Sequence, residues 1–75
     1  MNNEQRKQLK NWIIKMEGLK TELENYLNNE QEKFDNIPEN LQGSQRAQDS
    51  EDAIGCMEEA IELFDEIISI IEEIT

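Results

Sequence analysis

The feature that most constrains the fold of this chain is a seven-residue repeat between Glu51 and Ile74. Each unit opens with two acidic residues, and apolar residues follow at fixed positions within it. A strict heptad of this length is typical of an α-helix that packs in coiled-coil fashion. We therefore expect a helix from about residue 45 to about residue 74.

Two rows of apolar side chains run along this expected helix. The first seam consists of Ala47, Ile54, Met57, Ile61, Phe64, Ile68 and Ile71. The second seam consists of Ala53, Cys56, Ala60, Leu63, Ile67, Ile70 and Ile74. Because successive helical residues are rotated by about 100°, the two seams lie side by side. They form an apolar face that is too broad for one neighbouring helix to cover.

The first half of the chain carries another apolar stripe at helical spacing. Its members recur three or four residues apart and are Leu9, Trp12, Ile13, Met16, Leu19, Leu23, Tyr26 and Leu27. This spacing predicts a helix from about residue 3 to about residue 34. Because Trp12 and Tyr26 belong to the stripe, we expect them to be core residues and not ligand platforms. Lys20 and Glu24 lie four residues apart and should form a weak surface pair.

Residues 35–44 form the expected connection between the helices. Pro38 disfavours helix at the residue before it and suits the start of a short turn. Ser44 can cap the second helix. We expect the apolar Ile37 and Leu41 to tuck under the connection and seal the end of the core.

Helices joined by so short a connection fold back on each other, which predicts an all-α antiparallel helical hairpin. The first helix should cover the first seam and leave the second seam for another chain. A chain of 75 residues is near the size at which one copy struggles to bury enough apolar surface. We therefore expect a symmetric homodimer that forms a four-helix bundle. A monomeric hairpin that exposes a binding groove is the alternative.

The net charge of −11 is concentrated in the second half of the chain. Residues 1–33 hold six acidic and six basic residues, whereas residues 34–75 hold twelve acidic residues and only Arg46 as a base. Such a field repels nucleic acids and anionic membranes and attracts basic protein surfaces. The basic cluster of Arg6, Lys7 and Lys10 is too small to bind nucleic acid directly against this net charge.

Acidic doublets recur along the expected second helix on the side away from the seams. Together with one further glutamate they form the acidic face, which consists of Glu51, Asp52, Glu58, Glu59, Glu62, Asp65, Glu66, Glu72 and Glu73. One interpretation is a solvated surface that keeps an apolar helix soluble. The other is a surface that binds a basic site on a partner protein. In its sharpest form the acidic face imitates a nucleic-acid backbone and inhibits a DNA- or RNA-binding protein.

The chain lacks what metal and catalytic motifs require. A di-iron bundle needs His, and the chain has none. A calcium loop counted back from Gly55 would place Ile54 at a ligand position. Carboxylates on an open hairpin have no cleft that holds a substrate at set distances. We therefore expect no enzymatic activity, no metal and no cofactor.

Cys56 is the lone cysteine and cannot form an internal disulfide. We expect it to be a small buried apolar side chain. The N-terminal residues lack the apolar core of a signal peptide, and no apolar stretch is long enough to span a membrane. These features predict a soluble cytoplasmic protein.

The connector and its flanks carry a resemblance to a known group. The segment from Phe34 to Gln42 reads Phe-Asp-Asn-Ile-Pro-Glu-Asn-Leu-Gln, and a helix with a Glu-Glu-Ala-Ile unit follows it. In this pattern, over most of its length, the chain resembles short acidic helical-hairpin proteins encoded by bacteriophages and other mobile elements. The resemblance implies an origin and no particular activity. Gly55 and Cys56 depart from the group, which carries ordinary helix formers there.

Overall fold

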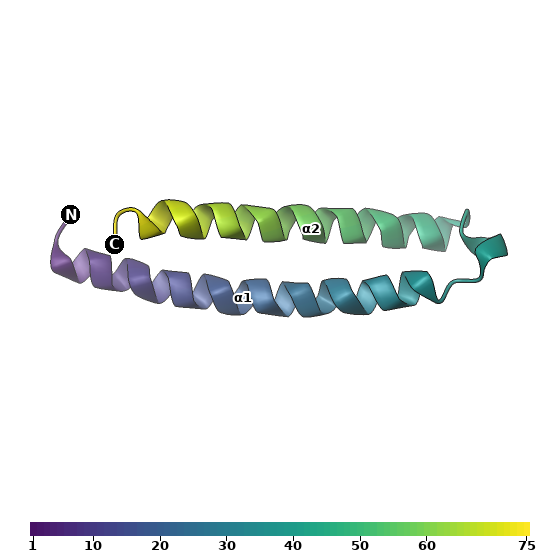
Figure 1. The fold of residues 1–75 in the computed structure, drawn as a ribbon, viewed down its shortest axis with the longest axis horizontal. Coiled ribbons are helices and arrows are strands. Elements are labelled where there is room, and N and C mark those ends of the chain that lie inside the picture. The colour runs from purple at the N-terminus through teal and green to yellow at the C-terminus, as the bar shows by residue number, and fades with distance from the viewer.

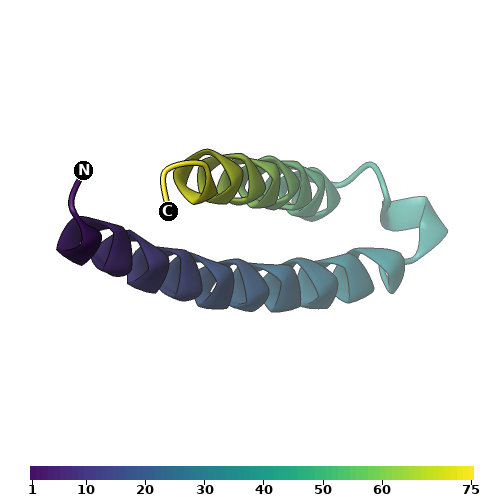
Figure 2. The same ribbon diagram turned by 60° about the vertical axis from the view of Figure 1, so that its left-hand side comes forward.

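Two long antiparallel helices make up the computed structural model, which describes residues 1–75 (Figure 1). Helix α1 spans Asn3–Asp35, a short 3₁₀ helix η1 spans Glu39–Leu41, and helix α2 spans Gln45–Glu72. The molecule is a rod of 59 × 15 × 13 Å. Both termini lie at one end of the rod and the connector lies at the other (Figures 1 and 2). The predicted all-α helical hairpin is confirmed.

Side chains at the start of each helix satisfy backbone N–H groups that have no partner within the helix. The Asn2 side chain accepts a 2.8 Å hydrogen bond from the Gln5 backbone, and the Gln5 side chain accepts one of 3.2 Å from the Asn2 backbone. This is a capping box. The Ser44 hydroxyl accepts a 3.3 Å hydrogen bond from the N–H of Ala47, so the cap predicted for the second helix is confirmed.

Two local hydrogen bonds stabilise the connector. The Gln42 side chain donates a 2.9 Å hydrogen bond to the carbonyl of Ile37, and Leu41 donates a backbone bond of 2.8 Å to Pro38. Ile37 is half-buried, as expected. Leu41 is 49% exposed, so the prediction that it seals the core is wrong. The η1 segment lies beyond the ends of both helices, where no helical surface is available to cover this side chain (Figure 1).

Contact between the helices follows one narrow strip with the spacing of a coiled coil. In α1 the positions conventionally labelled a are Ile13, Lys20, Leu27 and Phe34, and those labelled d are Leu9, Met16, Leu23 and Glu30. In α2 the a positions are Ala47, Ile54, Ile61 and Ile68, and the d positions are Ser50, Met57, Phe64 and Ile71. All of these residues are buried or half-buried. They form the contact strip, which contains the whole first seam, so the packing predicted for that seam is confirmed.

Three residues of the apolar stripe of α1 lie outside the contact strip. Trp12 is 53% exposed, Leu19 53% and Tyr26 64%, so the prediction that Trp12 and Tyr26 are core residues is wrong for this hairpin. Each of the three precedes a contact residue by one position and is therefore rotated by about 100° away from it. A single neighbouring helix covers only the residues that point directly at it, and these three point to one side.

Helix α2 continues without a break through Gly55 and Cys56. Cys56 is exposed, which corrects the expectation that it is buried. The reason is that Cys56 lies on the part of the second seam that points away from α1, and no part of the hairpin covers that part. Neither helix has an apolar stretch of the length and hydropathy needed to cross a membrane.

Candidate interaction surfaces

The acidic face lies on one flank of the hairpin and is fully open to solvent. All nine of its residues are exposed. The first member of each doublet follows a d residue of the contact strip, as Glu58 follows Met57, and thus occupies position e. Glu62 lies at position b on the same flank. At the usual helical rise the doublets step along α2 by about 10.5 Å.

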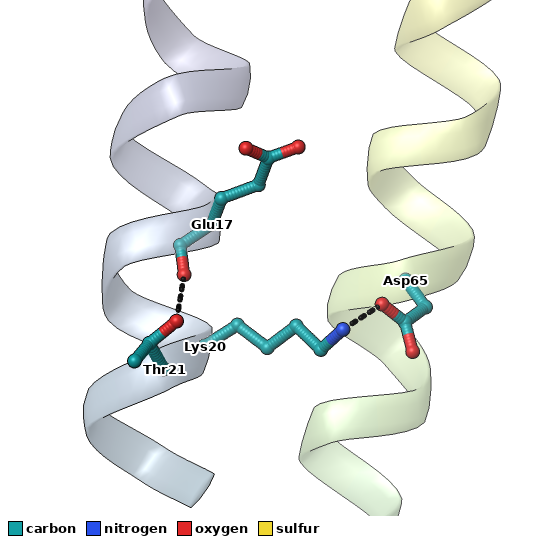
Figure 3. Close-up of polar contacts among 4 residues, drawn as sticks. All are labelled: Glu17, Lys20, Thr21 and Asp65. Atoms are coloured by element: carbon teal, nitrogen blue, oxygen red, sulfur yellow. Dashed lines mark hydrogen bonds and ion pairs between the residues drawn. The ribbon is translucent and has the colours of Figure 1, made fainter.

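Only one residue of the acidic face has a cationic partner. The Lys20 ammonium lies 2.5 Å from a carboxylate oxygen of Asp65, and this is the sole ion pair of the chain (Figure 3). The predicted pair between Lys20 and Glu24 is wrong. Lys20 occupies an a position, so its side chain extends across the contact strip to α2. It does not lie along the surface of α1 toward Glu24.

The surroundings of Lys20 are strongly acidic. The pKa of Lys20 is raised above 10.5, first by the hydrogen bond to Asp65, while desolvation acts in the opposite direction. The charges of Asp65, Glu24 and Glu17 raise it further. Figure 3 shows Glu17 on α1 one turn from Lys20, with its backbone carbonyl accepting a 3.0 Å hydrogen bond from Thr21.

Helix α1 adds two acids to this flank that the sequence analysis did not include. Glu17 and Glu24 occupy e positions, and in an antiparallel pair of helices the two e rows lie on the same side of the contact strip. A shallow hollow confirms this placement, because Glu24 and Asn28 of α1 line it together with Glu58 and Glu62 of α2. The antiparallel pairing of e rows was the signal that could have identified them.

The opposite flank of α2 is apolar and exposed. Leu63 is 50% exposed, Ile67 45%, Ile70 58% and Ile74 50%. Cys56 is also exposed, whereas the small Ala53 and Ala60 are half-buried beside the contact strip. The structure thus leaves the large residues of the second seam uncovered.

A polar contact at the connector end was not anticipated from the sequence. The Ser50 hydroxyl donates a 2.5 Å hydrogen bond to the Glu30 carboxylate, and both residues occupy d positions. Lys33, Arg46 and Asp49 line an open hollow beside this contact. Opposite charges are mixed in the hollow, so it offers no strong field to a ligand of either sign.

No group of three or more Cys, Asp or Glu side chains is placed to hold a metal ion. No family model, no curated protein and no solved structure matches this chain. Functional assignment therefore depends on the two flanks of the hairpin.

Proposed function

We propose that the chain is a non-catalytic, cytoplasmic protein-interaction module whose acidic face contacts a basic surface of a partner protein. The observation that carries the proposal is the exposure of all nine acidic residues, of which only Asp65 meets a cation. Rows of like charge destabilise a helix by tenths of a kcal/mol per pair. They also produce a directional field that steers a basic partner toward the surface and disfavours acidic ones.

The partner class that fits best is a basic, nucleic-acid-binding protein of a host cell, which the chain would inhibit by occupying its groove. DNA presents one charge per about 1.7 Å of its axis, which the doublets of one hairpin match only loosely. Two hairpins in a dimer would present two acidic faces. The resemblance of the connector region to phage and mobile-element proteins implies an origin in which the partner would belong to a host cell, and it implies no activity.

The dimer belongs to this proposal. Two hairpins that associate through the second seam form a four-helix bundle, with the acidic faces on the flanks away from the interface. The alternative function is a structural oligomerisation module in which the acidic face only maintains solubility. Exposed apolar residues on the second seam favour that alternative as much as they favour the dimer of the proposal. These residues are Leu63, Ile67, Ile70 and Ile74.

Charge removal on the acidic face separates the two functions. The test variant carries Glu58→Gln, Glu59→Gln and Glu66→Gln. Asp65 is retained because it pairs with Lys20. The matched control carries Glu4→Gln, Glu32→Gln and Glu39→Gln, which remove the same charge from exposed positions outside α2. Each tagged chain is used to capture proteins from a bacterial lysate, and the captured proteins are identified by mass spectrometry.

The proposal predicts a defined partner that the wild-type chain and the control retain and that the acidic-face variant loses. Equal capture by all three chains would contradict it, because the contact would then not depend on the acidic face. Recovery of the chain alone would favour the structural alternative. Helical circular dichroism of each chain verifies that the charge changes leave the fold intact.

A further inference from the structure

The outer surface of α1 carries an apolar row of its own. Trp12, Leu19 and Tyr26 are seven residues apart and occupy successive g positions, one step outside the contact strip. Charged and polar residues are the usual occupants of a helix surface that faces water, so three large exposed apolar side chains in register need an explanation. We call these three residues the outer row.

The outer row and the second seam lie on the same side of the hairpin. The second seam occupies positions g and c of α2, and the two g rows of an antiparallel helix pair flank the contact strip on one side. Hollows at both ends support this placement. Lys33 and Arg46, both at g positions, line one hollow together, and Met1 and Ile74 line the other.

The two rows are also level along the rod. Lys20 contacts Asp65 and Glu30 contacts Ser50, which sets the register between the helices. In that register Trp12 lies level with Ile70 and Leu19 with Leu63. Together the outer row and the second seam form one composite apolar face.

The size of the composite apolar face matches a stable interface. Its large side chains are Trp12, Leu19, Tyr26, Leu63, Ile67, Ile70 and Ile74, with exposed fractions from 45% to 64%. If each has a surface of roughly 150–250 Å², they leave about 500–900 Å² exposed. A standard protein interface buries about 800 Å² on each partner, whereas the largest patch of a typical monomer is about 300–600 Å².

The total surface supports the same conclusion. The hairpin exposes 5765 Å², whereas a folded monomer of 8.8 kDa is expected to expose about 4,800 Å². A rod exposes more surface than a sphere of equal mass, and pairing two rods along their length removes that surface. The excess is close to what one copy buries in a standard interface.

The charge of the composite apolar face favours a second copy as its occupant. Positions c and g hold five charged residues, of which three are basic and two acidic: Lys15, Lys33, Arg46, Glu22 and Asp49. The face is therefore close to neutral, although the whole chain has a net charge of −11. Two copies can meet here without bringing their acidic faces together. A basic partner would gain nothing at this face, because the acids lie on the other flank.

The distribution of side-chain sizes sets the orientation of that copy. On α2 the large Ile67, Ile70 and Ile74 lie toward the termini, and the small Ala53 and Cys56 lie toward the connector. Even packing requires large residues opposite small ones, which places the connector of one copy over the termini of the other. The same orientation separates the two basic Lys33–Arg46 pairs.

We propose that a second copy of this chain docks on the composite apolar face with its connector at the opposite end, so that α1 packs on α1 and α2 on α2. The two-fold axis passes near Leu19, which lies midway along α1. This inference rests on the proposed homodimer and adds to it the contribution of α1 and the orientation. Trp12 becomes buried on association.

The first test measures the mass of the purified chain by sedimentation equilibrium, together with Trp12 fluorescence. The face variant carries Leu19→Gln and Ile67→Gln, which are 53% and 45% exposed. The control carries Ile14→Gln and Leu41→Gln, which are 67% and 49% exposed but lie outside the face. We expect twice the chain mass of 8.8 kDa and blue-shifted emission for wild type and control. We expect the dissociation constant of the dimer to be at least tenfold higher for the face variant, so that more of it is monomeric.

Two results overturn the inference in different ways. A wild-type mass of one chain at high micromolar concentration rejects the dimer, and the face is then free for an apolar helix of another protein. A dimer that the face variant retains rejects this face, while the homodimer of the proposed function survives. Binding of a basic partner through the acidic face is measured separately and can fail or succeed independently of both.

The orientation is tested on a chain that keeps the whole face except its cysteine. Gly43→Cys with Cys56→Ser places one spin label per copy in the connector, where an added Cβ meets no atom within 4 Å. The proposed orientation predicts a label separation above half of the 59 Å rod length. A separation below that value would overturn it. This measurement also applies if the face variant fails to fold.

Discussion

The Ser50 hydroxyl of α2 donates a 2.5 Å hydrogen bond to the Glu30 carboxylate of α1, near the connector end of the contact strip. Ser50 is only 6% exposed. A polar pair in a largely apolar strip restricts the axial register of two helices, because any slip leaves its members without partners.

Ser50→Ala tests this contact. We expect it to lower the free energy of unfolding by about 1–2 kcal/mol, since the half-buried Glu30 loses its hydrogen-bond partner. Urea unfolding followed by circular dichroism, at one fixed protein concentration, measures the loss. Ser69→Ala is the control, because Ser69 is exposed on the same helix. Equal effects of the two substitutions would show that the contact does not stabilise the hairpin.

The Lys20–Asp65 pair predicts a dependence of stability on pH. The pKa of Lys20 in the folded chain is raised above 10.5, chiefly by its hydrogen bond to Asp65. Because the pKa is raised on folding, the stabilisation is fully present below pH 10.5. It is lost as the pH rises through the pKa of Lys20 in the folded chain. We expect the melting temperature of wild type to be higher than that of Lys20→Gln at neutral pH. This difference in melting temperature, the gap, should close at strongly alkaline pH.

Thermal melts across that range measure the gap between the two chains. All other titratable residues are common to both chains, so their contributions cancel in the difference. Lys7→Gln serves as the control because Lys7 has no ion-pair partner. A constant gap from neutral to alkaline pH would argue against the pair.

Salt should stabilise the hairpin. The exposed acids of α2 repel one another, and raising NaCl from about 0.01 M to about 1 M shortens the Debye length from about 30 Å to about 3 Å. We expect the melting temperature to rise over this range. The rise should be smaller in the variant with Glu58→Gln, Glu59→Gln and Glu66→Gln. If both chains respond equally, the repulsion does not arise from the acidic face.

Gly55 lies inside α2, where an added Cβ would meet no atom within 4 Å. Gly55→Ala should therefore stabilise the chain by about 0.5–1 kcal/mol through helix propensity and the unfolded-state entropy of glycine. Gly18→Ala, at an equally open position in α1, provides the comparison. A loss of stability specific to Gly55→Ala would indicate a close approach to another chain at that point.

The heptad of α2 predicted the helical hairpin and the side of α2 that faces α1. It succeeded because a seven-residue period leaves one continuous apolar row once the helix supercoils around a neighbour. The boundary between core and surface on α1 was not predictable in the same way. Trp12 and Ile13 are adjacent in a helical stripe, and only the number of neighbouring helices decides which of them is buried.

Polar residues in the contact strip were harder still to predict. Lys20 and Glu30 occupy positions where apolar residues are expected, and their partners Asp65 and Ser50 are twenty or more residues away in the sequence. No local pattern links such pairs, because their contact depends on the register between two helices. The residues of the acidic face could be predicted from the sequence. Its extension by Glu17 and Glu24 could not, because that prediction requires the register between the two helices.

The most direct test of the proposed function is capture from a bacterial lysate by the tagged wild-type chain, followed by elution in steps of increasing salt. Contacts between exposed charges weaken as the Debye length falls. We predict that one basic, nucleic-acid-binding protein elutes between low and moderate salt. Recovery of the chain alone, or of a partner that resists high salt, would contradict an interaction through the acidic face.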